Sequence, residues 1–163
     1  MRGGPTRLAA VMAAAVMAAA VMAAALALGG AAAALATTPE QIISERRAGY
    51  KHMGQNFKAM KDAIDAGAAV QPLAPKAAEI VAWAQRIPTL FPPGTETGGG
   101  THAKPAIWTD RAGFDKDAAA LQTQAGKLQQ AAQSGDKAAF AAQWKATAHA
   151  CGTCHQTYRY KLS

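Results

Sequence analysis

Four stretches of the chain carry apolar residues at spacings of three and four, and no stretch shows the alternation typical of a β-strand. Alanine, the residue with the highest helix propensity, is abundant throughout. A Gly- and Thr-rich stretch that begins at Phe91 separates the second helix from the third. The pattern therefore predicts an all-α protein, an antiparallel four-helix bundle with a long loop between helices 2 and 3. The expected helices span about 39–66, 76–90, 109–133 and 137–160.

Residues at the ends of these stretches are those that begin and end helices. Thr38 is a candidate N-cap, with a proline at the first helical position and a glutamine three residues after the cap. Pro75 opens the second helix, Ser134-Gly135 closes the third, and Asp136 caps the fourth. The simplest interpretation of each apolar stripe is that its residues form the core of the bundle. Alanines dominate the inward positions of the third and fourth helices, so these positions either pack very closely or leave space for a large flat group.

Residues 1–36 have the three-part layout of a secretory signal peptide. A short basic start contains Arg2 and Arg7, and an uncharged run from Leu8 to Leu28 contains three copies of VMAAA. Ala34-Leu35-Ala36 provides small residues at both positions that a signal peptidase reads. A retained membrane anchor is the alternative, because the run is long enough to span a bilayer. Alanine is only weakly apolar and no charged residue follows, so we expect cleavage and a mature domain over 37–163.

The charge balance argues against a nucleic-acid-binding protein. The full chain has 17 Lys and Arg against 10 Asp and Glu, and two of the arginines lie in the leader. Residues 37–163 therefore carry 15 basic and 10 acidic side chains, a net charge of +5 without a polybasic run. The only two cysteines are three residues apart, which excludes a disulfide framework.

The segment Cys151-Gly152-Thr153-Cys154-His155 is a C-x-x-C-H motif, the pattern of covalent c-type haem attachment. Positions i, i+3 and i+4 of a helix share one face, about 5–6 Å apart. Two thiols placed in this way can add to the two vinyl groups on one edge of a porphyrin, and His155 can then donate an imidazole nitrogen to the iron. The motif predicts one haem c, bound through Cys151 and Cys154 and ligated by His155.

Three other interpretations of the motif are disfavoured by its place on the helix. A redox dithiol normally lies at a helix start after a strand, whereas Cys151 and Cys154 lie near a helix end, where the helix dipole disfavours thiolate. A zinc site would need His149 as well, but His149 and Cys151 point about 200° apart on a helix with 3.6 residues per turn. A disulfide between Cys151 and Cys154 is strained within a regular helix. Haem attachment is the preferred interpretation, and export agrees with it.

The sequence resembles the cytochrome c′ family, the class II c-type cytochromes, over about residues 40–161. The resemblance is carried by the attachment site near the C-terminus and by Arg46 with Tyr50 one turn later. It is also carried by the segments Leu90–Thr95, Ala103–Trp108 and Cys151–Arg159. The resemblance implies a periplasmic monohaem cytochrome that binds nitric oxide or carbon monoxide and exchanges single electrons. It implies no enzymatic turnover, and a homodimer formed through the first two helices.

The resemblance also implies roles for individual residues. Tyr50 would cover the haem face opposite His155, and a neutral tyrosine is a poor iron ligand. We therefore expect five-coordinate, high-spin iron, with a low-spin, six-coordinate electron carrier that uses a methionine, Met53, as the alternative. Arg46 would pair with a haem propionate. Arg159 would lie beside the proximal imidazole.

The remaining histidines and aromatic residues are expected to have structural roles. Tyr158 and Phe114 should pack on the porphyrin, and the three tryptophans should serve the core or a subunit contact. No ligand role is expected for His52, His102 or His149. Two haem propionates would reduce the net charge to about +3, too little to indicate steering toward an acidic redox partner. The redox partner is therefore unidentified, and neither nucleic acid nor stable membrane insertion after cleavage is expected.

Overall fold

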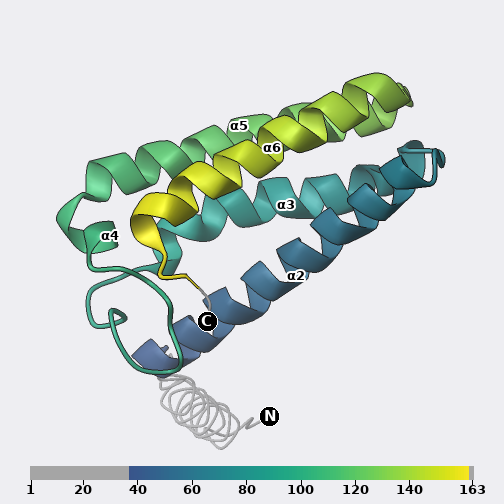
Figure 1. Cartoon of the computed structure of the whole chain (residues 1–163). Helices are drawn as coiled ribbons and strands as arrows, with labels where there is room; N and C mark the ends of the chain where they lie inside the picture. Colours follow the sequence, from purple (N-terminus) through teal and green to yellow (C-terminus); the bar gives the residue numbers. More distant parts are fainter. Residues whose placement is uncertain (1–36, 162–163) are drawn as a thin grey trace, which may run out of the picture. The chain divides into compact units, whose positions relative to one another are not determined.

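The computed structural model describes residues 37–161, and the leader expected over residues 1–36 lies outside this range. Four long helices, α2 (Pro39–Asp65), α3 (Ala74–Arg86), α5 (Arg111–Ser134) and α6 (Lys137–Tyr158), form an antiparallel bundle (Figure 1). The short helix α4 (Ala106–Thr109) lies in the long connection between α3 and α5. Two 3₁₀ turns, Gln71–Leu73 and Ile87–Leu90, flank α3.

The expected fold class is confirmed. Over residues 37–161 the only β-type pairing is an isolated antiparallel bridge between Ala103 and Arg159. Within this range, no helix combines the length and the apolar character that crossing a membrane requires.

Three helix starts have side-chain caps, of which the sequence predicted two, those at Thr38 and Asp136. The Thr38 hydroxyl accepts a hydrogen bond from the Gln41 backbone N–H at 3.2 Å, and the Thr38 N–H donates to the Gln41 side chain at 2.8 Å. The Asp110 carboxylate accepts a hydrogen bond from the Gly113 N–H and so caps the start of α5. The Asp136 carboxylate accepts a hydrogen bond from the Ala139 N–H and so caps the start of α6. Gly135, with φ of 75°, provides the left-handed residue between α5 and α6.

The second and fourth helices differ slightly from the expected bounds. Helix α3 begins two residues before Lys76, with Pro75 at its second position, and its last turn over Ile87–Leu90 is 3₁₀. Pro88 has no N–H to donate to a carbonyl four residues earlier, which accounts for the tighter turn. Helix α6 ends at Tyr158, because Arg159 is extended and pairs with Ala103.

The core consists of two clusters, one toward each end of the bundle. The first cluster surrounds Phe91 and Phe114, and the second surrounds Met60 and Phe140. All six residues expected to face inward on the third helix are buried: Phe114, Ala118, Leu121, Ala125, Leu128 and Ala132. The buried alanines of α5 lie in the same clusters as Ala77 and Ala84 of α3. Close packing of α3 on α5 is therefore what these small residues provide.

Helix α2 contacts the bundle at fewer places than the other helices, and α3 and α6 each pack along α5 (Figure 1). The Phe57 ring stacks on Trp144 of α6, with ring centroids 4.8 Å apart. The Trp144 indole N–H donates to the Phe57 carbonyl at 3.1 Å. Trp83 of α3 lies directly against Gly49 of α2, where a Cβ atom would overlap its ring. The glycine therefore lets α2 approach α3.

Substitution of Gly49 by alanine should destabilise the fold by about 1–3 kcal/mol, because Trp83 would have to move out of a packed position. Gly54 lies on the same helix with open space where a Cβ would stand. Gly54→Ala should therefore stabilise the helix by about 0.5–1 kcal/mol. Urea denaturation of both variants measures the difference. Equal effects of the two substitutions would contradict the close approach at Gly49.

Candidate cofactor-binding site

The three motif residues lie on the last two turns of α6. Cys151, Cys154 and His155 are half-buried, between the buried residues Phe140 and Tyr158 of the same helix. Both cysteines are free thiols that pack against the first core cluster. The helical spacing expected from the sequence therefore exists, and it presents both thiols toward the apolar interior rather than toward solvent.

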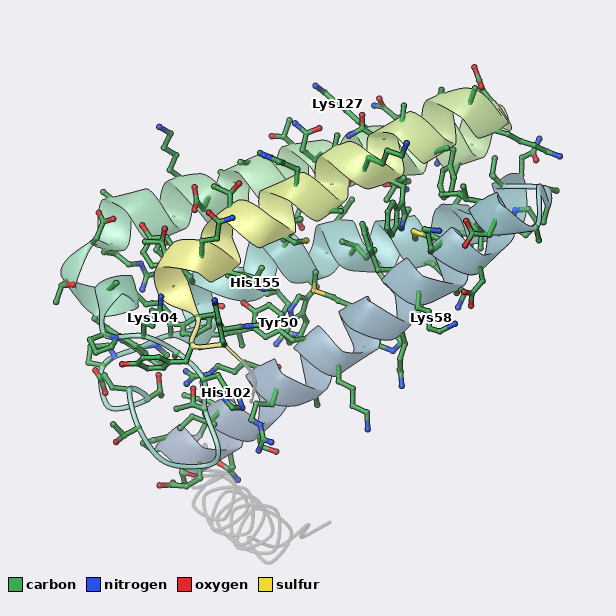
Figure 2. The ribbon with its side chains drawn as sticks, in the orientation of Figure 1. Tyr50, Lys58, His102, Lys104, Lys127 and His155 are labelled. Carbon is green, nitrogen blue, oxygen red and sulfur yellow. The ribbon has the colours of Figure 1, made fainter. Side chains whose placement is uncertain are left out.

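Tyr50 approaches the same region from α2. Its side chain packs against the first core cluster, as those of Cys151 and Cys154 do. Figure 2 shows Tyr50 and His155 at the same end of the bundle. Burial raises the pKa of the Tyr50 hydroxyl, and nearby Cys154 raises it further, against a smaller opposing effect of Arg46. Tyr50 is therefore a neutral phenol. Its ring meets Trp83 edge to face, with centroids 6.1 Å apart.

The protonation states of the motif residues follow from their burial. Burial raises the pKa of the Cys151 thiol, and burial together with Asp117 raises that of Cys154 to about 12. Burial, helped by the positive charge of Arg159, lowers the pKa of His155. The thiols are thus protonated and the imidazole neutral at pH 7. A reactive dithiol requires the opposite, a lowered thiol pKa.

His149 lies on a different side of α6 from the cysteines. It is exposed and lines a hollow of about 410 Å³ between α5 and α6, together with Asp117 and Thr153. Neither cysteine lines this hollow. In the described part of the chain, no three His, Cys, Asp or Glu side chains are placed to share a metal ion.

Arg46 is buried and holds the long connection between α3 and α4. One terminal nitrogen, Nη1, donates to the Leu90 carbonyl at 3.3 Å and to the Thr95 hydroxyl at 3.0 Å. The other, Nη2, donates to the Thr95 carbonyl at 2.7 Å and to the Thr101 hydroxyl at 2.5 Å. The guanidinium also lies 4.5 Å from the Phe91 ring centroid. This set of contacts, which the sequence did not indicate, makes Arg46 a structural residue of the loop.

Arg159 lies immediately after α6, beside the motif. Its backbone N–H donates to the His155 carbonyl at 3.2 Å, and its charge adds to the effect of burial in lowering the pKa of His155. His52 and His102 are exposed, and the His52 Nε2 atom lies within hydrogen-bond distance of the Glu79 carboxylate, at 2.7 Å. The structure thus brings Arg46, Tyr50, Arg159 and the motif together and leaves the other histidines outside.

Two aromatic residues of the region, Tyr158 and Trp83, form contacts that the sequence did not indicate. Tyr158 is buried against Phe114, and its hydroxyl donates to the Asp110 carboxylate at 2.6 Å. Trp83 packs beside Tyr50, and its indole N–H is buried without an acceptor among residues 37–161. Neither contact has a signal in the sequence, because each joins residues more than 30 positions apart.

Comparison with known proteins identifies relatives over most of the described chain. A family profile described as Cytochrome C′ matches residues 41–159. The chain is 46% identical to cytochrome c′ of Rubrivivax gelatinosus over 77 residues, which are 45% of this chain and 57% of that relative. It is 32% identical to cytochrome c′ of Pararhodospirillum photometricum over 123 residues, which are 75% of this chain and 98% of that relative.

Structural alignments with solved proteins of the same fold cover nearly the whole of each solved chain. Cytochrome c′ from Thermochromatium tepidum superposes with a TM-score of 0.72 at 30% identity, over 76% of this chain and 98% of that one. The nitric oxide complex of a cytochrome c prime variant from Alcaligenes xylosoxidans has a TM-score of 0.70 at 28% identity, over 77% of this chain and 98% of that one. A cytochrome c′ with ligand-controlled dimer dissociation has a TM-score of 0.72 at 29% identity, over 76% of this chain and 98% of that one.

Proposed function

Because the chain belongs to the cytochrome c′ family, we propose that residues 37–163 are a monohaem c-type cytochrome domain. Cys151 and Cys154 would hold one haem, and His155 would ligate its iron. The observation that carries the proposal is the placement of both free thiols and the imidazole on one end of α6, opposite Tyr50 of α2.

The residues present fit such a group in three respects. The thiols lie among apolar side chains of the first core cluster, the surroundings that a porphyrin requires. Two cationic side chains, Arg46 and Arg159, lie close enough to Tyr50 to affect its pKa, and the group carries two anionic propionates. The Trp83 indole N–H is buried in the same region with no acceptor in the described part of the chain, which costs about 1–3 kcal/mol unless a partner is supplied.

Each residue then has a defined task. A bound haem supplies reversible one-electron chemistry and an iron position that can take a diatomic gas. The Cys151 and Cys154 sulfurs fix the group to α6, and the neutral imidazole of His155 provides the nitrogen lone pair for iron. Arg159 stabilises the neutral imidazole through its nearby charge. Arg46 already donates four hydrogen bonds to the loop from Nη1 and Nη2. Only the remaining donor of its guanidinium and its positive charge are available to a haem propionate.

We infer that the iron is five-coordinate and high-spin, and that the sixth position binds nitric oxide or carbon monoxide. Tyr50 is the residue opposite the motif, and its neutral hydroxyl is a weak ligand. One of the similar solved structures is a nitric oxide complex. The protein would therefore be a gas-binding electron carrier rather than an enzyme, with a redox partner yet to be identified.

Absorption spectra of the purified, dithionite-reduced protein test this proposal. The expected result is a high-spin ferrous spectrum that changes on addition of carbon monoxide. A protein without covalent haem would contradict the whole proposal. A sharp low-spin spectrum that carbon monoxide leaves unchanged would contradict the vacant sixth position alone.

Substitution of Tyr50 by alanine should accelerate carbon monoxide binding by about tenfold or more, equivalent to about 1.4 kcal/mol of steric barrier. The substitution removes a ring that packs against the same core cluster as Cys151 and Cys154, so a gas molecule should reach the iron with less steric hindrance. Stopped-flow mixing of the ferrous protein with carbon monoxide measures the rate. Tyr50→Phe is the matched control, since it keeps the ring and removes only the hydroxyl. Equal rates in Tyr50→Ala and the parent protein would exclude a gating role.

A six-coordinate electron carrier is the second candidate, because Met53 is half-buried and packs against the same core cluster as Tyr50. A thioether ligand would give low-spin iron. Met53→Leu distinguishes the two candidates, since it would convert a low-spin spectrum to high-spin only if the Met53 sulfur binds iron.

Export and self-association complete the proposal. We propose that residues 1–36 are a cleaved signal peptide and that the domain works in the periplasm, where its haem is attached. We also propose a homodimer formed through α2 and α3. A shallow, mainly apolar hollow on this face is lined by Gly49, Met53, Ala82 and Trp83, with polar residues around it. One similar solved structure is described as a dimer.

A further inference from the structure

Two of the three motif residues lie at a helix end. Cys154 and His155 belong to the final stretch of α6, which ends at Tyr158. The last carbonyls of a helix have no partner within the helix, so a terminal turn opens easily unless other segments hold it. An iron ligand at this place therefore depends on contacts outside its own helix for a fixed orientation.

Tyr158 provides a side-chain contact of this kind. It is buried, and its hydroxyl donates to Oδ2 of the Asp110 carboxylate at 2.6 Å. Its ring meets Phe114 of α5 edge to face, with centroids 5.4 Å apart. Tyr158 follows His155 by three residues and Cys154 by four, spacings that share one side of a helix. The contact is therefore made on the side of α6 that carries the motif.

The acceptor of this hydrogen bond is itself fixed. Oδ1 of Asp110 accepts from the Gly113 N–H at 3.2 Å, so the carboxylate belongs to the capped start of α5. A Cβ atom at Gly113 would overlap both the Asp110 carboxylate and the Tyr158 hydroxyl. Glycine at this position thus leaves the space in which the two groups meet. The bond joins the end of α6 to the start of α5.

The carbonyls of the same turn are held by other segments. The Lys104 N–H donates to the Tyr158 carbonyl at 3.0 Å, and the Lys104 ammonium donates to the Gln156 carbonyl at 2.8 Å. The Arg159 N–H donates to the His155 carbonyl at 3.2 Å. These bonds fix the path by which the chain leaves α6. The Tyr158 hydroxyl, in contrast, fixes the turn against α5.

The geometry points to Tyr158 and Asp110 as a positioning pair that keeps Cys154 and His155 in one orientation relative to α5. The inference rests on the proposed function, because it gives the pair a role toward the axial ligand of the proposed haem. The pair acts through the last turn of α6 and needs no contact with the iron. The hydrogen bond to Asp110 raises the pKa of the Tyr158 hydroxyl to about 12, so the hydroxyl remains a donor at neutral pH. A charged acceptor makes such a bond stronger than one between neutral groups.

Amide hydrogen exchange of the purified protein tests whether the pair holds the turn. Tyr158→Phe keeps the ring that packs on Phe114 and removes only the hydroxyl. The amides of Cys154 and His155 should then exchange about tenfold faster or more, because the turn opens at lower free energy. Amides around Phe140, near the start of α6 and in the second core cluster, should change much less. Equal acceleration along the whole of α6, or none at His155, would overturn the inference.

Tyr160→Phe is the matched control, because it removes the same group from a tyrosine two residues away. Tyr160 is 53% exposed, and its hydroxyl forms no hydrogen bond within residues 37–161. This variant should exchange at the rate of the parent protein. If it accelerated exchange at His155 as much as Tyr158→Phe does, the bond to Asp110 would not be the cause and the inference would fail.

Resonance Raman spectra of the dithionite-reduced protein separate positioning from a merely structural role. The iron–imidazole stretching band should shift or broaden in Tyr158→Phe, because His155 then adopts more than one orientation. Asp110→Asn should have a smaller effect, since asparagine also caps helices and keeps one acceptor oxygen. Asp117→Asn is the charge control: Asp117 is a half-buried carboxylate of α5 that affects the pKa of Cys154. This variant should leave the band in place.

The outcomes distinguish the pair from the proposed function. A band unchanged in Tyr158→Phe would leave the hydrogen bond a structural role only and overturn the positioning role. Equal shifts in Asp110→Asn and Asp117→Asn would show an effect of charge and overturn it as well. Absence of any haem band from the parent protein would instead contradict the proposed function, on which the role of the pair depends.

Discussion

A chain with serine in place of both Cys151 and Cys154 is expected to contain no covalent haem. Thioether bonds require sulfur at both positions, and serine is close to cysteine in size, so the helix itself should remain. The mass of the denatured protein should fall by that of one haem beyond the loss of the two sulfur-for-oxygen exchanges. Any remaining haem should be extracted by acidified organic solvent.

Thr153→Ser is the control for this experiment, since Thr153 is exposed within the same motif and faces away from the cysteines. It should keep the haem and its spectrum. A single serine substitution, at Cys151 or at Cys154, should leave one thioether and a lower yield. Haem that stays bound to the double variant through denaturation would contradict attachment at these cysteines.

Replacement of Arg46 by methionine is expected to destabilise the fold by about 3–5 kcal/mol. Methionine fills much of the space but leaves the Leu90 and Thr95 carbonyls and the Thr95 and Thr101 hydroxyls without their donor. For a domain of this size, the expected decrease in Tm is roughly 10–20 °C. Circular dichroism during heating measures the decrease.

Arg47→Gln provides the neighbouring control. Arg47 is exposed and donates a single hydrogen bond to the same loop, to the Gly99 carbonyl at 2.7 Å. Its substitution should cost less than about 1 kcal/mol. If the two arginine variants melted at the same temperature, the loop would not depend on the buried guanidinium, and propionate binding would become the main role of Arg46.

The sequence predicted those parts of the fold that depend on local signals. Apolar spacing identified four helices, and the caps at Thr38 and Asp136 begin α2 and α6 as expected. The strongest result is α5, where every residue expected to face inward is buried. The spacing within the motif, together with the helical pattern, also placed Cys151 and Cys154 toward the interior and His149 on another side.

The parts that the sequence did not predict depend on contacts between distant segments. The end of α6 was expected two residues later, because nothing near Tyr158 indicates that Arg159 pairs with Ala103. The contacts of Arg46 join α2 to a loop more than 40 residues away. The approach of Trp83 to Gly49 depends on how α2 and α3 cross, which helical periodicity leaves undetermined.

The unequal packing of the four helices has a consequence for how the protein can respond to a small molecule. Helix α5 is the shared neighbour of α3 and α6, so these three helices support one another, whereas α2 contributes fewer contacts to the whole. A segment with fewer contacts is displaced at lower free energy. Because Tyr50 belongs to that segment, a gas bound at the proposed haem would meet a side of the site that can be displaced, while the helix that carries the thiols stays in place.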